Sequence, residues 1–299
     1  MRFLSEPGRT RIVTGAGCVD GIVEALPVPP GGRILLVTDA GLLAAGHVGR
    51  LELLLRSAGW DIATFSEVRE NPDTDDVAAC LRTAQAGPVD AIVALGGGSS
   101  LDTAKGAALL LVNGGRLEDF WHTGKPTNPL PPLIAIPTTA GTGSEMQSFA
   151  IISDPATHRK MAIGTPMLAP AAAFLDPDLT ASMPLRTASI TGIDALSHAL
   201  EAGVSTKTTA FGRDCAIEAW GMIQPNLTAV VNGSADTDAR LAMLTGSAAA
   251  GRAIENGMLG AAHALANPLT AHFGLPHGQA VGTMLPHVIR FNAESPDVA

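Results

Sequence analysis

The sequence has no tyrosine, few other aromatic residues and a shortage of positive charge. Aromatic residues make up 4% of the 299 residues, which leaves little of the stacking surface used by proteins that bind single-stranded nucleic acid. Asp and Glu outnumber Lys and Arg by 28 to 19, giving a formal net charge of −9. Nucleic acids and anionic membranes attract basic surfaces. We therefore expect neither a nucleic-acid partner nor a membrane partner.

Cysteines and long apolar runs are also scarce. The three cysteines, Cys18, Cys80 and Cys215, are too widely spaced for a disulfide framework or a cysteine-rich zinc site, so a reducing cytoplasm is the expected location. The N-terminal segment is interrupted by charge and a turn, unlike a signal peptide. The apolar runs at 107–112 and 168–175 are too short or too broken to cross a bilayer. A hydrophobic content of 46% predicts a globular protein with a substantial core.

Strand signals alternate with helix signals over the first part of the chain. Short apolar runs typical of buried strands lie at 11–13, 33–38, 61–65, 89–95, 131–136 and 172–175, with a weak hairpin signal at 150–163. Helical segments are expected from the turn at 15–17 to near Pro27, and at 42–59, 74–86 and 101–112. This alternation predicts a mostly parallel, doubly wound α/β domain over residues 1–182.

The character of the sequence changes after about residue 180. Strand signals stop, and helical stretches rich in Ala and Leu follow at 186–203, 208–224, 237–254 and 257–272. Residues 183–299 are therefore expected to form an all-α domain, with Met183 and Pro184 as the hinge. The final residues have no capping or closing character, so we expect this helical domain to be incomplete.

A glycine-rich loop, Gly96-Gly97-Gly98-Ser99-Ser100, joins a predicted strand to a predicted helix. Glycines let the backbone approach a phosphate, and unpaired N–H groups at a helix start point towards it. The loop is neither the G-x-G-x-x-G fingerprint nor a P-loop, because no Gly-Lys-Ser/Thr closes it. A tight strand-to-helix turn without a ligand is the alternative. Phosphate binding is favoured, but the loop does not specify which nucleotide.

A second loop rich in glycine and hydroxyl groups, residues 138–144, follows another strand, and Asp39 follows a third. In open parallel sheets, ligands bind outside the carboxyl ends of the strands. We therefore expect both loops to face one crevice. There, Asp39 could accept hydrogen bonds from a ribose diol and repel a 2′-phosphate. Alternatively, it could only cap the helix that follows it.

Asp194 and His198 lie four residues apart in a helical stretch, a spacing that places both side chains on one helix face. They could be an ordinary helix-surface pair or half of a metal site. His263, on a predicted helix, and His277, in a Pro-His-Gly turn, are candidates for the remaining ligands. One Asp and three His suit Fe(II) or Zn(II), with room for a substrate oxygen. The H-E-x-x-H signature of metallopeptidases is absent.

Taken in order, these motifs resemble the iron-containing (group III) alcohol dehydrogenases, near lactaldehyde reductase and 1,3-propanediol dehydrogenase. The resemblance covers nearly all of the chain. It implies that Gly97, Gly98 and Ser99 hold the cofactor pyrophosphate and that Asp194, His198, His263 and His277 bind the metal. It further implies that Thr138, Thr139 and Thr142 border the nicotinamide, that Asn71, Lys160 and Leu179 line the cofactor cleft, and that Asp39 favours NAD over NADP.

The sequence departs from the family pattern in two places. Family members often carry a proton-relay histidine four residues after the third metal ligand, but this position is Asn267, which cannot titrate. The proton would then pass through the cofactor ribose, water or another group such as His272, and no catalytic residue is assigned. The family also usually extends well beyond the position where this sequence ends.

The expected function is a metal-dependent NAD(H) alcohol dehydrogenase or aldehyde reductase. It would act on a small alcohol, diol or hydroxy acid, with the metal stabilising an alkoxide while hydride passes to the nicotinamide. A homo-oligomer is the expected state. Three alternatives are a maleylacetate reductase-like enzyme, a dehydroquinate synthase-like lyase and an inactive cofactor-binding remnant. The metal set argues against the first, and the scarcity of Lys and Arg around that set argues against the second. Asn267 and the early end of the sequence favour the third.

Overall fold

Six strands form one parallel sheet, as the alternating sequence pattern predicts. The computed structural model describes residues 10–121 and 125–294 and orders the strands β1-β8-β5-β4-β2-β3, with every pairing parallel. The predicted hairpin is confirmed as an antiparallel pair outside the main sheet. The strands are β1 (Arg11–Thr14), β2 (Arg33–Val37), β3 (Asp61–Phe65), β4 (Ala91–Gly96), β5 (Leu133–Pro137), β6 (Phe149–Asp154), β7 (Arg159–Gly164) and β8 (Ala172–Leu175).

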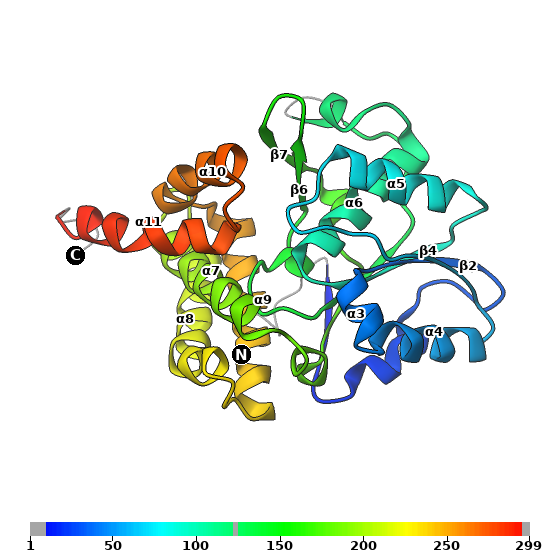
Figure 1. Cartoon of the computed structure of the whole chain (residues 1–299), viewed down its shortest axis with the longest axis horizontal. Coiled ribbons are helices and arrows are strands. Elements are labelled where there is room, and N and C mark those ends of the chain that lie inside the picture. The colour runs from blue at the N-terminus through cyan, green and yellow to red at the C-terminus, as the bar shows by residue number, and fades with distance from the viewer. Residues whose placement is uncertain (1–9, 122–124, 295–299) are drawn as a thin grey trace. The chain divides into compact units, whose positions relative to one another are not determined.

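Alternate residues of each strand pack into separate cores on the two faces of the sheet. Leu35 and Val37 lie in the core shared with α5 (Thr74–Gln85) and α6 (Gly98–Asn113), whereas Ile34 and Leu36 lie in the core shared with α4 (His47–Ser57). Figure 1 shows α3 (Ala40–Ala44) and α4 on the opposite side of the sheet from α5 and α6. The predicted doubly wound arrangement is therefore confirmed.

Two predicted helices of this region are wrong in extent. The helix expected over 42–59 is two helices, because Gly46 adopts a left-handed conformation (φ +83°) between α3 and α4. The segment from Gly17 towards Pro27 forms only a 3-10 turn and one helical turn, α2 (Ile22–Ala25). The 3-10 turns are η1 (Cys18–Gly21), η2 (Leu117–Phe120), η3 (Ser144–Met146), η4 (Pro166–Leu168) and η5 (Pro177–Thr180).

Five helices follow the sheet in the sequence: α7 (Leu185–Val204), α8 (Ala210–Val231), α9 (Thr237–Gly257), α10 (Ala261–Phe273) and α11 (His277–Asn292). The predicted stretch 257–272 begins later than expected. Met258, at φ +65°, ends α9, and Gly260 is the N-cap of α10. The turn predicted at His277 is the start of α11, with Pro276 as its N-cap. That helix was not predicted.

The described residues divide into two compact units. The α/β unit contains residues up to Thr138 and from Gln147 to Ser182, and the helical unit contains Thr139–Met146 and the residues from Met183 onwards. The short loop joins the helices because its backbone packs directly on α9. A Cβ at Gly143 would lie 2.6 Å from Gly251 Cα, so only glycine fits at this contact.

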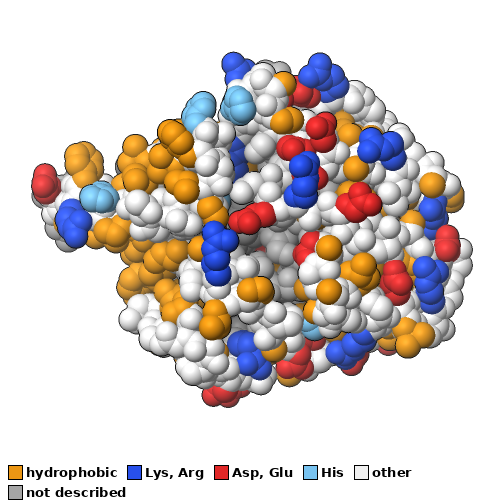
Figure 2. Space-filling model, in the orientation of Figure 1, with side chains coloured by type: hydrophobic (Ala, Val, Ile, Leu, Met, Phe, Trp, Pro, Cys, Tyr) orange, Lys and Arg blue, Asp and Glu red, His pale blue; other side chains and the backbone are white. Residues whose placement is uncertain are grey.

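The described helices include none that is both long and apolar enough to cross a membrane. Figure 2 shows positive and negative side chains interspersed over the α/β unit and apolar side chains gathered over part of the helical unit. Exposed apolar residues of α10 and α11 include Leu265, Phe273 and Phe291, the last two being 74% and 75% exposed.

Candidate functional site

Helix α7 carries Asp194 and His198 on one buried face, as their spacing predicts. His198 Nε2 lies 3.5 Å from Asp194 Oδ1, and both side chains are almost completely buried. The rest of α7 explains this burial, because its inward positions are mostly small residues such as Ala195, Ala199 and Ala202. Neighbouring helices can therefore pack close to the two polar side chains.

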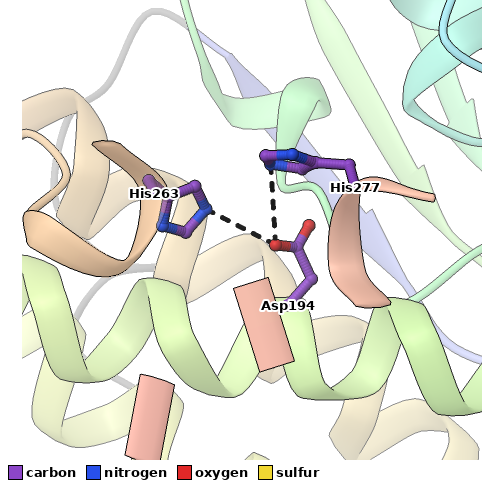
Figure 3. A group of neighbouring side chains, drawn as sticks. All are labelled: Asp194, His263 and His277. Atoms are coloured by element: carbon purple, nitrogen blue, oxygen red, sulfur yellow. Dashed lines mark ion pairs between the residues drawn. The ribbon is translucent and has the colours of Figure 1, made fainter. Parts of the chain in front are cut away.

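The other two predicted ligands come from α10 and α11 and meet the same carboxylate oxygen. His263 Nε2 lies 3.4 Å and His277 Nε2 lies 3.9 Å from Asp194 Oδ1, and Figure 3 shows both rings turned towards this carboxylate. One potential ligand atom each from Asp194, His263 and His277 lies within 4.8 Å of the others. His198 is outside this group of three, but its ring stacks on His263 with centroids 4.8 Å apart.

Hydrogen bonds fix the orientation of two of these rings. His263 Nδ1 lies 2.5 Å from a carboxylate oxygen of Glu201, and His198 Nδ1 lies 3.2 Å from the carbonyl oxygen of Gly141. An ionised carboxylate and a carbonyl only accept hydrogen bonds, so Nδ1 donates in both rings. In a neutral ring, Nε2 then carries the lone pair, and in both cases this atom faces Asp194 Oδ1.

This arrangement fits a bound cation. Asp194 Oδ1 and His263 Nε2 are buried, and neither has a hydrogen-bond partner. Lone pairs that face one another in a buried site repel unless positive charge lies between them. One carboxylate oxygen with imidazole nitrogens is a ligand set that suits a divalent first-row metal. The residues present therefore fit the metal that the sequence predicts.

The charges of the site are consistent with this fit. Burial alone would raise the pKa of Asp194, but the neighbouring histidines His198, His277 and His263 lower it on balance. Burial lowers the pKa of His198. Burial also opposes charge on His263, but the adjacent Asp194 carboxylate and the hydrogen bond to Glu201 raise its pKa to about 9. Both carboxylates stay ionised, so the site holds excess negative charge that a proton or a metal ion can balance.

Glu201 was missed by the sequence interpretation. Burial would raise its pKa, but hydrogen bonds from the His263 side chain and from the start of α10 lower it. A signal was present, because Glu201 follows Asp194 by seven residues and His198 by three, which places all three on one helix face. Gly141 could not be found in this way, since its contribution is a backbone carbonyl.

The predicted phosphate loop lies at a reversal in strand order. Strand β4 lies between β2 and β5. The carboxyl ends of these neighbouring strands are followed by Asp39 (after β2), Gly97–Ser99 (after β4) and Thr138 (after β5). The helices that leave β2 and β4 pack on opposite faces of the sheet. This is the topological switch point at which open α/β sheets bind ligands. Helix α6 begins there with Gly97 as an N-cap that has no side-chain hydrogen bond, which leaves the first N–H groups available to an anion.

Asp39 caps the helix that follows it. Its Oδ1 accepts a hydrogen bond from the backbone N–H of Leu42 at 3.1 Å, so Asp39 does act as an N-cap. Oδ2 lies on the side of Gly96, 3.5 Å from the position that a Cβ would take there. Capping uses one oxygen, and the second is directed towards the glycine loop.

The remaining predicted cofactor residues are spread over the chain. Thr139 and Thr142 lie in the loop of the helical unit, whereas Asn71 and Lys160 lie in the α/β unit, Asn71 at φ +54° and Lys160 opposite Ser153 in the hairpin. Leu179 is 4% exposed and packs in the core, which leaves little of its side chain to contact a ligand.

The position of the expected relay histidine is on α10. Asn267 lies one helical turn after His263 and is exposed. His272 follows His263 by nine residues, which places it roughly half a turn away around the helix. His272 therefore points away from the face that carries His263.

Comparisons with known proteins agree over nearly all of the chain. Residues 9–177 match a family model described as iron-containing alcohol dehydrogenase, and residues 188–299 match the C-terminal model of that family. Alcohol dehydrogenase 4 of Schizosaccharomyces pombe is 36% identical over 94% of this chain and 67% of its own length. The NAD-dependent methanol dehydrogenase of Bacillus methanolicus is 36% identical over 94% and 74%. A crystal structure of 1,3-propanediol oxidoreductase superimposes with a TM-score of 0.90 at 34% identity, covering 95% of this chain and 74% of that one.

Proposed function

We propose that this chain, which belongs to the iron-containing alcohol dehydrogenase family, oxidises small alcohols with NAD and reduces the corresponding aldehydes with NADH. The family expected from the sequence is confirmed, and so is its fold. The observation that carries the proposal is the buried group around Asp194 Oδ1. This oxygen and His263 Nε2 face each other at 3.4 Å, neither has a hydrogen-bond partner, and His198 Nε2 lies 3.5 Å from the same oxygen. An alcohol, a diol or a hydroxy acid is the proposed substrate class.

We assign metal binding to Asp194, His198, His263 and His277, within the predicted helical domain 183–299. Iron is the metal that the family name favours, and the ligand types also suit zinc. A bound metal ion would act as a Lewis acid on the substrate oxygen. Glu201 and the Gly141 carbonyl hold two of the rings with Nε2 directed at the shared carboxylate.

We assign NAD binding mainly to the predicted domain 1–182. Gly97, Gly98 and Ser99 would hold the pyrophosphate at the start of α6, and Asp39 would accept from the ribose hydroxyls. The other proposed cofactor residues are Asn71, Thr138, Thr139, Thr142, Lys160 and Leu179. Oxidation transfers hydride from the carbinol carbon to NAD+ and releases one proton. Because Asn267 cannot accept that proton, water or the cofactor ribose would carry it.

The alternatives expected from the sequence are less well supported. The metal ligand set and the relatives that act on alcohols disfavour a maleylacetate reductase-like enzyme, a dehydroquinate synthase-like lyase and an inactive remnant. A homo-oligomeric state, a cytoplasmic location and the absence of nucleic-acid and membrane partners remain proposals from the sequence.

The function is tested by reconstituting metal-free protein separately with Fe(II) and Zn(II). Small primary alcohols, diols, hydroxy acids and aldehydes are then screened with NAD+ or NADH, and turnover is followed by the absorbance of NADH. We expect metal-dependent turnover of at least one small alcohol and its aldehyde. Stoichiometric metal binding without turnover of any of these classes would contradict the proposed reaction.

Replacing Asp39 by glycine should shift cofactor preference towards NADP. The substitution removes a carboxylate that would repel a 2′-phosphate, and such like-charge contacts cost several kcal/mol, so the NADP+ to NAD+ ratio of kcat/KM should rise about tenfold or more. Glycine is chosen because replacing an Asp N-cap by Gly costs only a few tenths of a kcal/mol.

The matched control for this change is Asp236→Gly. Asp236 caps α9 through a hydrogen bond from the Ala239 N–H and belongs to the helical unit. The Asp236→Gly variant loses the same type of cap, so its NADP+ to NAD+ ratio of kcat/KM should equal that of the wild-type protein. An unchanged ratio in Asp39→Gly as well would show that Asp39 acts only as a cap.

A further inference from the structure

We infer that Glu201 is a positioning residue for the metal site, holding both the backbone and the ring of His263 in place. The inference rests on the proposed metal function. It concerns a side chain that is not itself among the proposed ligands. Glu201 lies on α7, the helix that carries Asp194 and His198, whereas His263 lies on α10. Its carboxylate therefore links the ligands of two different helices.

One oxygen of Glu201 caps α10. The N-cap of this helix is Gly260, which has no side chain that could accept a hydrogen bond. Oε1 of Glu201 takes this role and accepts a hydrogen bond from the Ala262 N–H at 2.5 Å. A Cβ at position 260 would lie 2.9 Å from the same oxygen, so the glycine also makes room for the carboxylate. A negative charge at a helix N-terminus is further stabilised by the helix dipole.

The other oxygen orients the ligand ring. Oε2 of Glu201 accepts a hydrogen bond from His263 Nδ1 at 2.5 Å. Ala262 and His263 are consecutive, so one carboxylate fixes the backbone immediately before the ligand and the ring of the ligand itself. With Nδ1 donating, Nε2 is left to face Asp194 Oδ1 at 3.4 Å.

A purely structural cap would not require this arrangement. Ser, Thr, Asp or Asn at the N-cap position could satisfy the start of α10 without a remote buried charge. Glu201 is only 4% exposed, and burying a carboxylate is costly unless it is well compensated. A carboxylate on the outer nitrogen of a metal-binding histidine fixes the ring tautomer and raises the basicity of the ligand nitrogen. This effect on the ligand nitrogen explains why Glu201 accepts a hydrogen bond from His263 Nδ1 in addition to capping α10.

The test is the metal affinity of Glu201→Gln. Glutamine has one acceptor oxygen, so it cannot accept from both Ala262 N–H and His263 Nδ1–H, and its NH2 group opposes whichever donor is left. We expect the Kd for Co(II), measured by visible absorption, and the Kd for Zn(II), measured by chelator competition, to rise about 10- to 100-fold. Asp238→Asn, the same type of change at an exposed position on α9, should leave both Kd values unchanged.

Each outcome decides between the two proposals. If the Glu201→Gln variant binds metal as tightly as the wild-type protein does, the positioning role is overturned but the metal function is not. In that case, a lower melting temperature of the metal-free variant would identify Glu201 as only a cap. Wild-type protein that binds no divalent metal would overturn the metal function and this inference with it.

A second measurement keeps the inference testable if Glu201→Gln does not fold. The zinc-loaded wild-type protein, labelled with ¹⁵N-histidine, reports which ring nitrogen of His263 carries the proton. We expect a protonated Nδ1 and a metal-bound Nε2. A metal-bound Nδ1 would overturn the role of Glu201, because that nitrogen would no longer donate to it.

Discussion

Replacing Asp194 by asparagine should abolish stoichiometric metal binding and lower kcat for alcohol oxidation at least about 10³-fold. The Oδ1 atom of Asp194 is the common neighbour of three histidine Nε2 atoms, at 3.5, 3.4 and 3.9 Å. Asparagine removes the charge and can place an NH2 group among these nitrogens. A Lewis acid contributes several kcal/mol to stabilising the transition state, and each 1.4 kcal/mol is about a tenfold change in rate.

Three measurements check this prediction: metal content, turnover and binding of NADH by fluorescence. NADH should still bind, because the proposed pyrophosphate loop belongs to the α/β unit. Added metal should raise the melting temperature of the wild-type protein, since a ligand at 100 times its Kd stabilises by about 2.7 kcal/mol, but should not raise that of the variant. Asp238→Asn again serves as the control. Asp194→Asn protein that retains metal and turnover would contradict the site.

The sequence predicts the α/β part of the fold well, because its strands are short and the central ones, β2, β4, β5 and β8, are apolar and buried on both faces. Periodicity cannot locate breaks that depend on one backbone angle. The helix predicted over 42–59 is interrupted by a single left-handed glycine, Gly46. Helix α11 was missed for a related reason, since the Pro-His-Gly sequence at 276–278 has the composition of a turn but begins a helix.

The candidate metal site was predictable to the extent that it depends on side-chain type and helical spacing. Asp194 and His198 follow from an i,i+4 pair. His263 and His277 could be proposed as ligands from the sequence, but their approach to the same oxygen depends on how α10 and α11 pack on α7. The supporting groups were not predicted. The spacing of Glu201 from Asp194 and His198 places it on their helix face, but nothing in the sequence shows that it reaches His263, and a backbone carbonyl such as that of Gly141 has no sequence signal.

The cofactor residues differ in how strongly the fold supports them. Gly97–Ser99, Asp39 and Thr138 follow adjacent strands at the switch point, which is where the physics of open sheets places a ligand. The positions of Asn71 and Lys160 rest on the family resemblance alone. Leu179 packs in the core, so its main contribution is to the packing of that core.

Replacing Gly278 by alanine should damage the metal site without altering any proposed ligand. Gly278 follows His277 in the first turn of α11, and a Cβ there would lie 2.0 Å from the carbonyl oxygen of Ile190 and 2.8 Å from its carbonyl carbon. Both atoms belong to the α7 backbone, which cannot rotate away. Helix α11 must therefore shift by about 1 Å or more relative to α7, since close-packed interiors have no free space to absorb the methyl group.

We expect this shift to displace His277 from Asp194 and to weaken metal binding about 10²-fold, the scale on which misplacement by 1 Å affects a site. Overpacking should also cost about 1–3 kcal/mol of stability. Both effects are measurable as the Kd for Co(II) and the melting temperature of the metal-free protein. Wild-type metal affinity in the variant would show that α11 does not fix the position of His277.

Gly282→Ala is the matched control, one turn later on the face of α11 that packs against α7. A Cβ there would lie 3.2 Å from Ile193 Cγ2, a side-chain atom that can move. Alanine is a better helix former than glycine by about 0.5–1 kcal/mol, so this variant should keep its metal affinity and be as stable as the wild type or more so. Opposite effects of the same added methyl group would show that the site depends on the close approach of α11 to α7 at Ile190, and not on helix propensity.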